Sequence, residues 1–225
     1  MIDFCLQELE ALISIVGLNL TRQELYVEDW ETLKNRSMID DPTVYVKLPK
    51  IDAERLCKEI VGRSIMIKEI IDVFSEAQIY PQPQPVEGKE LYKESAIRYS
   101  KVIDNVDQTK LLPLLSQGKK FKFSIEAVGR RCSLKEQVEI IELFKKFPFD
   151  DEDVSLDHAE LIYKIIENTT DGRVYCGRVV ACYKEDTNSG KGKNDDTYHY
   201  KYHLKKRPYL GPTSTDHELA FLMAN

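Results

Sequence analysis

Lysine and arginine side chains gather near the ends of several predicted strands in the second half of this chain. Such cations neutralise phosphate groups, and the planar fork of arginine also allows bidentate contact with a phosphate. We therefore treat Arg178 and Arg207 as the preferred fork-like contacts. The full set of candidate phosphate-binding side chains is Lys119, Lys120, Arg130, Arg131, Arg178, Lys205, Lys206 and Arg207.

Tyrosines are interleaved with the last basic cluster, at Tyr198, Tyr200, Tyr202 and Tyr209. Aromatic rings stack on unpaired bases, so lysine and tyrosine in this arrangement fit binding of a single-stranded nucleic acid. The same residues also fit an ordinary strand, because tyrosine favours strands and lysine lines solvated faces. The residues alone leave both interpretations open.

No catalytic or cofactor motif is visible in the sequence. None of the histidines lies beside a Gly-x-Ser-x-Gly elbow or a recognisable cysteine motif, so no nucleophilic triad is predicted. Residues 190–193 (GKGK) lack the P-loop spacing and precede no predicted helix. We therefore assign no catalytic, cofactor-binding or metal-binding residue to this chain.

Composition places the chain among ordinary globular proteins, with 225 residues, 42% hydrophobic and 31% charged. The net charge of −6 excludes a globally basic nucleic-acid binder but allows a local basic patch. The cysteines are scattered without a CxxC pair, which is typical of reduced thiols and predicts no zinc site. With no signal peptide or membrane span in the sequence, we expect a cytoplasmic protein without a membrane partner.

The first half has the alternating elements of an α+β fold. Amphipathic helices are predicted around 9–16 and 53–61, and strands at 44–48 and 65–74. Alternating prolines then favour an extended linker at 81–90.

The second half is predicted to contain helices, strands and a final turn. The cleanest strand covers 120–127, where Phe121, Phe123, Ile125 and Ala127 share one face. Ser133 and Glu136 form a capping box that opens a helix. The acidic run 150–153 is expected to be a solvated loop. The other predicted elements are helices at 90–103 and 107–116 and strands at 161–165, 173–183 and 197–204.

The C-terminal tail combines a turn with the start of a helix. Gly211 and Pro212 make the turn, and residues 215–218 (TDHE) form a second capping box. Leu219 and Met223 then lie on one apolar helical face. This short face is expected to pack against residues beyond the end of the sequence; the alternative is an ordinary C-terminal helix that docks on its own domain.

At these residues the chain resembles the catalytic subunit of the eukaryotic tRNA guanine-10 N2-methyltransferases. The resemblance is carried by VYCGRVVA (174–181) and by LKKRPYLGPTSTDHELAFLMAN (204–225). Upstream, residues 133–168 resemble the middle of that family's RNA-binding THUMP domain, and residues 48–74 resemble its N-terminal ferredoxin-like domain. The resemblance thus covers most of the chain.

The resemblance implies an α+β chain with an N-terminal ferredoxin-like domain followed by a THUMP domain. The implied divisions are a ferredoxin-like domain at 1–80, a linker at 81–90, a THUMP domain at 91–210 and a junction at 211–225 to a methyltransferase domain. THUMP domains in such enzymes are implied to bind the acceptor end and the single-stranded 3′ terminus of tRNA. The eight basic residues named above are our candidate RNA contacts.

The implied chemistry lies outside this sequence. The family's Asp-Pro-Phe-x-Gly-x-Gly cofactor motif and Asp-Pro-Pro-Tyr catalytic motif are not found here. S-adenosylmethionine and a small zinc-containing activator subunit are implied partners of that absent domain, so we expect this chain to be inactive alone. Two other functions stay open: a non-catalytic THUMP-type adaptor for tRNA, and a protein-interaction module, which the net charge of −6 would suit.

Overall fold

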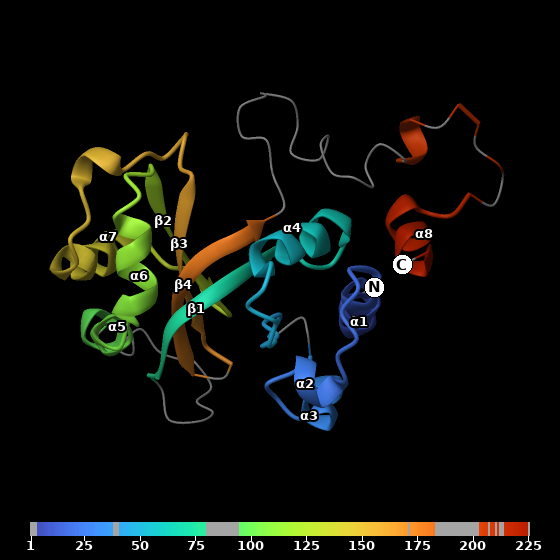
Figure 1. Ribbon diagram of the computed structural model, residues 1–225, viewed down its shortest axis with the longest axis horizontal. Helices are drawn as coiled ribbons and strands as arrows, with labels where there is room; N and C mark the ends of the chain where they lie inside the picture. Colours follow the sequence, from blue (N-terminus) through green and yellow to red (C-terminus); the bar gives the residue numbers. More distant parts are fainter. Residues whose placement is uncertain are drawn as a thin grey trace. The chain divides into compact units, whose positions relative to one another are not determined.

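The computed structural model describes residues 4–37, 41–79, 95–170, 172–182, 203–206, 208, 209, 211 and 214–224. They fold as two compact units (Figure 1): unit 1 contains Met1–Ile70 and Val180–Asn225, and unit 2 contains Ile71–Val179. Strands β1 and β4 contribute residues to both units, because each boundary falls inside one of them. The helices are α1 Cys5–Ile15, α2 Arg22–Leu25, α3 Trp30–Asn35, α4 Ala53–Arg63, α5 Ser95–Asp104, α6 Gln108–Leu115, α7 Leu134–Glu142 and α8 His217–Ala224.

A four-stranded mixed sheet with the order β1-β4-β3-β2 is the centre of unit 2. Strands β2 and β3 are parallel, and α7 makes the crossover that a parallel pair requires. Strands β3 and β4 are antiparallel neighbours, with Tyr163 opposite Arg178. The strands are β1 Glu69–Gln78, β2 Phe121–Val128, β3 Leu161–Asn168 and β4 Arg173–Cys182.

Strand β1 runs antiparallel to β4 at the edge of this sheet. The Ile79 amide donates to the Gly172 carbonyl over 2.9 Å, while Gly177, five residues further along β4, lies against Asp72. A Cβ atom at Gly177 would lie only 2.3 Å from the Asp72 carbonyl oxygen. The close approach of these two backbones therefore requires glycine.

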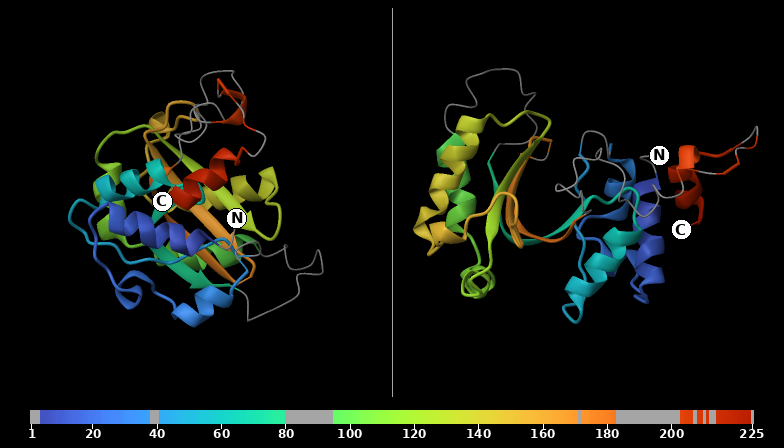
Figure 2. Two further views of the ribbon diagram at one scale, coloured as in Figure 1. Left: turned by 90° about the vertical axis from the view of Figure 1, so that its right-hand side faces the viewer. Right: turned by 90° about the horizontal axis from the view of Figure 1, so that it is seen from above.

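Helices α5, α6 and α7 all lie on one face of the sheet (Figure 2). The predicted alternation in β2 is confirmed: Phe121 is buried, and Phe123 and Ile125 pack into the core on the same face. Phe121, Phe123 and Tyr163 have ring centroids 5.7–5.8 Å apart, within the favourable range for aromatic pairs. The sequence alternation of β2 thus fixes which face the helices cover.

The helices of unit 2 begin where side chains can satisfy the free backbone amides. Asp107 accepts a hydrogen bond from the Thr109 amide over 3.0 Å and caps α6, which contains Pro113. The predicted Ser133–Glu136 capping box is confirmed, since both reciprocal bonds are present at the start of α7. These caps fix the two loops that enter the helical layer.

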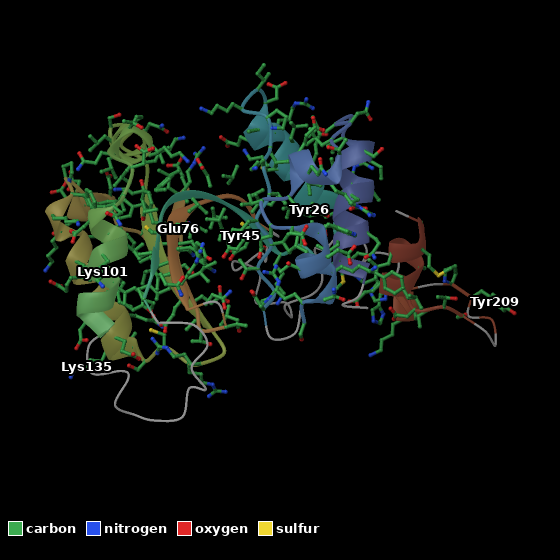
Figure 3. All side chains as sticks on the ribbon, turned by 90° about the horizontal axis from the view of Figure 1, so that it is seen from below. Tyr26, Tyr45, Glu76, Lys101, Lys135 and Tyr209 are labelled. Atoms are coloured by element: carbon green, nitrogen blue, oxygen red, sulfur yellow. The ribbon has the colours of Figure 1, made fainter. Side chains whose placement is uncertain are left out.

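Unit 1 is built from helices, with α1 packed beside α4 and the short α2 and α3 around Tyr26 (Figure 3). The carboxylate of Glu8 on α1 is buried and accepts bonds from Ser64 Oγ, Ile65 N and Met66 N over 2.7, 2.8 and 3.0 Å. Three donors compensate the cost of burying this charge. Glu8 therefore ties α1 to the turn that follows α4.

The predicted strands of the first half differ from the observed ones. Residues 44–48 do not join the sheet: Val46 makes only an isolated antiparallel bridge with Tyr26. The strand predicted at 65–74 begins later, as β1, and its Phe74 is buried in the core of unit 2. A local pattern shows that a strand can form but not which partner will pair with it. The predicted linker at 81–90 lies outside the described residues.

The capping box predicted at 215–218 is wrong. Asp216, not Thr215, caps α8: its carboxylate accepts from the Glu218 and Leu219 amides over 2.9 and 3.4 Å. A cap whose side chain bonds the second and third helical amides places the helix start at His217, one residue later than the box requires.

Candidate nucleic-acid interface

Lys119 and Lys120 stand at the start of β2, where an acidic segment meets Lys120. The Lys120 ammonium donates to the Glu152 carbonyl over 2.6 Å and pairs with Asp153 at 3.2 Å. The acidic run 150–153, predicted to be a solvated loop, is therefore bound through Lys120 to the start of the edge strand β2. Any phosphate that reached Lys120 would compete with this carboxylate and meet the repulsion of its neighbours.

Residues after the acidic run continue along the same end of β2. The Ser155 amide donates to the Phe121 carbonyl over 2.9 Å, and the Lys122 ammonium reaches the Leu156 carbonyl at 3.4 Å. Lys119 is exposed and makes no ion pair among the described residues. This end of the sheet is therefore less positive than its lysines alone suggested.

Arg178 lies in the middle of β4, directly opposite Tyr163 of β3. Residues opposite each other in an antiparallel pair share a face, so Arg178 is on the face that the helices cover. Burial raises the pKa of Tyr163 to about 12, and the positive charge of Arg178 offsets part of that rise. Arg178 is half-buried, which limits the fork-like phosphate contact that the sequence suggested.

Arg130 follows β2 at the opposite end of the strand, and its side chain is only 8% exposed. Its Nε atom donates to Glu167 over 3.1 Å, Nη2 pairs with the same carboxylate, and Nη1 donates to Glu136 over 3.1 Å. Tyr99 of α5 adds a hydroxyl donor to Glu167, whose side chain is fully buried. The guanidinium is therefore committed to a network inside unit 2 and does not face a ligand.

This network shifts the proton affinities of its members. Burial raises the pKa of Tyr99, and the Glu167 charge raises it further. Burial alone would lower the pKa of Arg130, but the hydrogen bonds and charge of Glu167 raise it far above its ordinary value. Burial likewise would raise the pKa of Glu136, yet hydrogen bonds from Ser133 and Arg130 lower it. The shifts of Arg130 and Glu136 favour their charged forms, whereas the shift of Tyr99 keeps its hydroxyl protonated as a hydrogen-bond donor.

Arg131 has the opposite environment from its neighbour. It is exposed, and among the described residues no carboxylate lies within ion-pair distance of its guanidinium. Its backbone carbonyl accepts a bond from Arg130 over 3.3 Å. Of the two arginines that the sequence placed together, only Arg131 presents a guanidinium to solvent.

Lys205 and Lys206 lie in the 3-10 turn Leu204–Lys206 rather than at the end of a strand. Both are exposed, and the Lys205 amide donates to His203 Nδ1 over 3.1 Å. Nearby Tyr209 is 79% exposed and projects outward (Figure 3). Arg207 and residues 198, 200 and 202 lie outside the described residues, as does most of the strand predicted at 197–204.

The predicted basic residues of unit 2 do not form one patch. Lys119 and Lys120 precede the eight residues of β2 and Arg130 and Arg131 follow them, which separates the two groups by roughly 25 Å. Lys205 and Lys206 belong to unit 1. The sequence groups these residues by type, whereas the structure separates the two basic pairs within unit 2.

Sequence reasoning missed Glu167, the central acceptor of the Arg130 network. Leu161, Tyr163, Ile165 and Glu167 alternate along β3 and share the core face. An ionisable residue in an otherwise apolar inward series needs a buried partner of opposite charge. That pattern was the available signal, although the partner itself could not be read from it.

Neither a metal-binding cluster nor a membrane-spanning helix is found in the part of the chain that the structure describes. There, histidine, cysteine and carboxylate side chains form no group of three that could hold a metal ion. None of the described helices combines the length and apolar character that crossing a bilayer requires.

Comparison with known proteins finds similarity along essentially the whole chain. A tRNA (guanine(10)-N(2))-methyltransferase of Dictyostelium discoideum is 25% identical over 99% of this chain and 42% of its own length. The proteins of the same name from Rattus norvegicus and Saccharomyces cerevisiae are 21% and 26% identical over 100% and 93% of this chain. No protein-family model matches. The chain therefore spans well under half of the curated relatives that it resembles.

Proposed function

We propose that this chain is the tRNA-binding region of an S-adenosylmethionine-dependent tRNA guanine-10 N2-methyltransferase. The observation that carries the proposal is the extent of the similarity to proteins of that name, which reaches both ends of this chain but covers only about 42% of theirs. Similarity spread over two folded units is better explained by shared ancestry than by one short motif.

Within this proposal, residues 1–80 correspond to an N-terminal ferredoxin-like domain and residues 91–210 to a THUMP domain, with β1 (Glu69–Gln78) pairing into the sheet of the second unit. The mixed sheet covered by helices on one face is compatible with such an RNA-binding α+β module. S-adenosylmethionine and a small zinc-containing activator subunit would bind elsewhere in the enzyme, and the enzyme would act in the cytoplasm. This chain contributes recognition only.

The mechanism we propose is positional. The chain holds the acceptor end and the 3′ strand of tRNA, so that a guanine elsewhere in the tRNA is placed at the active site of the complete enzyme. Exposed cations suit the phosphate contacts best, namely Lys119, Arg131, Lys205 and Lys206. Lys120 and Arg130 are less suited, because each already pairs with carboxylates.

The test compares binding of the chain to intact tRNA and to the same tRNA without its single-stranded 3′ end, by gel shift and by salt titration. We expect intact tRNA to bind more tightly, and replacement of Lys205, Lys206 and Arg207 by alanine to weaken binding and reduce its salt dependence. A control triple variant would replace Lys34, Lys50 and Arg63, which lie elsewhere in unit 1 and lose the same charge. Failure to bind either RNA would reject the proposed function.

A further inference from the structure

The segment Gly129–Ser133 between β2 and α7 is held at both ends. Gly129 has a φ of +85°, and a Cβ atom there would lie 2.2 Å from Thr169 Oγ1. The Thr169 hydroxyl donates to the Val128 carbonyl over 2.7 Å. Gly129 therefore lies directly against Thr169, the residue that follows β3. The capping box of Ser133 and Glu136 fixes the last residue.

The buried side chain of Arg130 fixes the middle of this segment. It links β3 through Glu167 and α7 through Glu136, and the hydroxyl of Tyr99 on α5 donates to the same Glu167 oxygen that Arg130 binds. Its Nη1 atom also donates to the carbonyl of Arg131. The backbone of the next residue is thus bound directly by a side chain that is itself almost fully buried.

In this segment, the side chain of Arg131 is directed to solvent. Its side chain makes neither an ion pair nor a hydrogen bond with the residues that the structure describes, and it is exposed beside the ends of the parallel strands β2 and β3. A free guanidinium offers a planar set of donors that matches two oxygens of one phosphate. Holding its backbone still lowers the entropy lost when it binds.

We propose that Arg130 is a positioning residue and Arg131 the phosphate contact that it positions, so the two adjacent arginines have different roles in binding an RNA backbone. The inference rests on the proposed tRNA-binding function and assigns one contact within it. Arg130 acts through the buried carboxylate of Glu167 and never touches the RNA.

The experiment is a double-mutant cycle in the full chain, with an unmodified tRNA transcript as the probe. Arg131→Ala should weaken binding roughly five- to tenfold and lower the salt slope by about one phosphate contact. The charge-balanced pair Arg130→Met with Glu167→Leu removes the anchor without leaving the fully buried carboxylate of Glu167 unpaired. That pair should weaken binding less, with an unchanged salt slope, and should have no further effect once Arg131 is alanine.

Controls separate this inference from the function on which it rests. Lys101→Ala, on the exposed side of α5, removes the same charge as Arg131→Ala and should leave binding within about twofold. If the unaltered chain binds tRNA but Arg131→Ala binds equally well, or if the Arg130 and Glu167 pair lowers the salt slope, the assignment of roles is overturned. If the unaltered chain binds no tRNA, the proposed function falls and this inference with it.

Discussion

Replacing Arg130 by methionine should destabilise unit 2 more than any surface substitution, because it leaves the buried carboxylate of Glu167 without its cationic partner. The Glu167 side chain is 0% exposed and the Arg130 side chain 8% exposed, so water can replace little of the lost interaction. Methionine has a similar length and leaves no large cavity. The dominant effect is therefore electrostatic and not a loss of packing.

The expected size follows from these contacts. Breaking a buried ion pair by removing one partner costs about 3–5 kcal/mol, a large share of the 5–15 kcal/mol of a typical domain. Replacing Glu167 by leucine as well should recover most of this loss, since apolar residues can substitute for a buried pair. The Tyr99 hydroxyl would then lack its acceptor, at about 1–3 kcal/mol, which Tyr99→Phe should relieve.

The assay must report on unit 2 alone. The only tryptophan, Trp30, lies in unit 1, so its fluorescence follows the other unit and serves as an internal reference. Hydrogen exchange of the β2 and β3 amides in increasing urea gives the free energy of opening of the sheet itself. Lys135→Ala is the matched control, because that side chain is 88% exposed and extends into solvent (Figure 3).

Either of two results would contradict this expected loss of stability. One is a loss below about 1 kcal/mol for Arg130→Met, which would mean that the pair is solvated in solution. The other is a double variant that loses the sum of the two single losses, since additivity within about 0.5 kcal/mol would show no coupling between the residues.

Three further predictions follow from contacts elsewhere. Gly177→Ala places a Cβ 2.3 Å from a backbone carbonyl oxygen of β1, so it should lower the free energy of unfolding by about 1–3 kcal/mol in urea. Gly62→Ala in α4 meets no atom within 4 Å and should raise the free energy of unfolding by about 0.5–1 kcal/mol. Glu136 has a lowered pKa, so its contribution is complete above the unfolded value near 4.5 and is lost as pH falls through the folded value. Glu136→Gln should therefore flatten the acid side of the stability curve, and an unchanged curve would contradict the assignment. Asp216→Ala should reduce the free energy that stabilises α8 by about 1 kcal/mol, because the helix loses its N-cap, whereas Thr215→Ala should leave it unchanged. Hydrogen exchange of the α8 amides would measure both effects.

Much of the local structure of unit 2 could be predicted because it depends on residues close in sequence. The alternation of Phe121, Phe123 and Ile125 predicted the buried face of β2, and the spacing of Ser133 and Glu136 predicted the start of α7. Strand pairing in the first half could not be predicted in this way. A short apolar run can pair with several partners, and only the packed core selects one of them.

The candidate interface was predicted by residue type but not by arrangement. The sequence by itself determined that cations cluster at 119–120, 130–131 and 205–207. Only the tertiary structure decided that Arg130 is buried and Arg131 exposed, because the partner of Arg130 lies 37 residues away at Glu167. The sequence cannot show which of two identical neighbours meets a carboxylate from another strand, so the two side chains acquire different environments only once β3 brings Glu167 to Arg130.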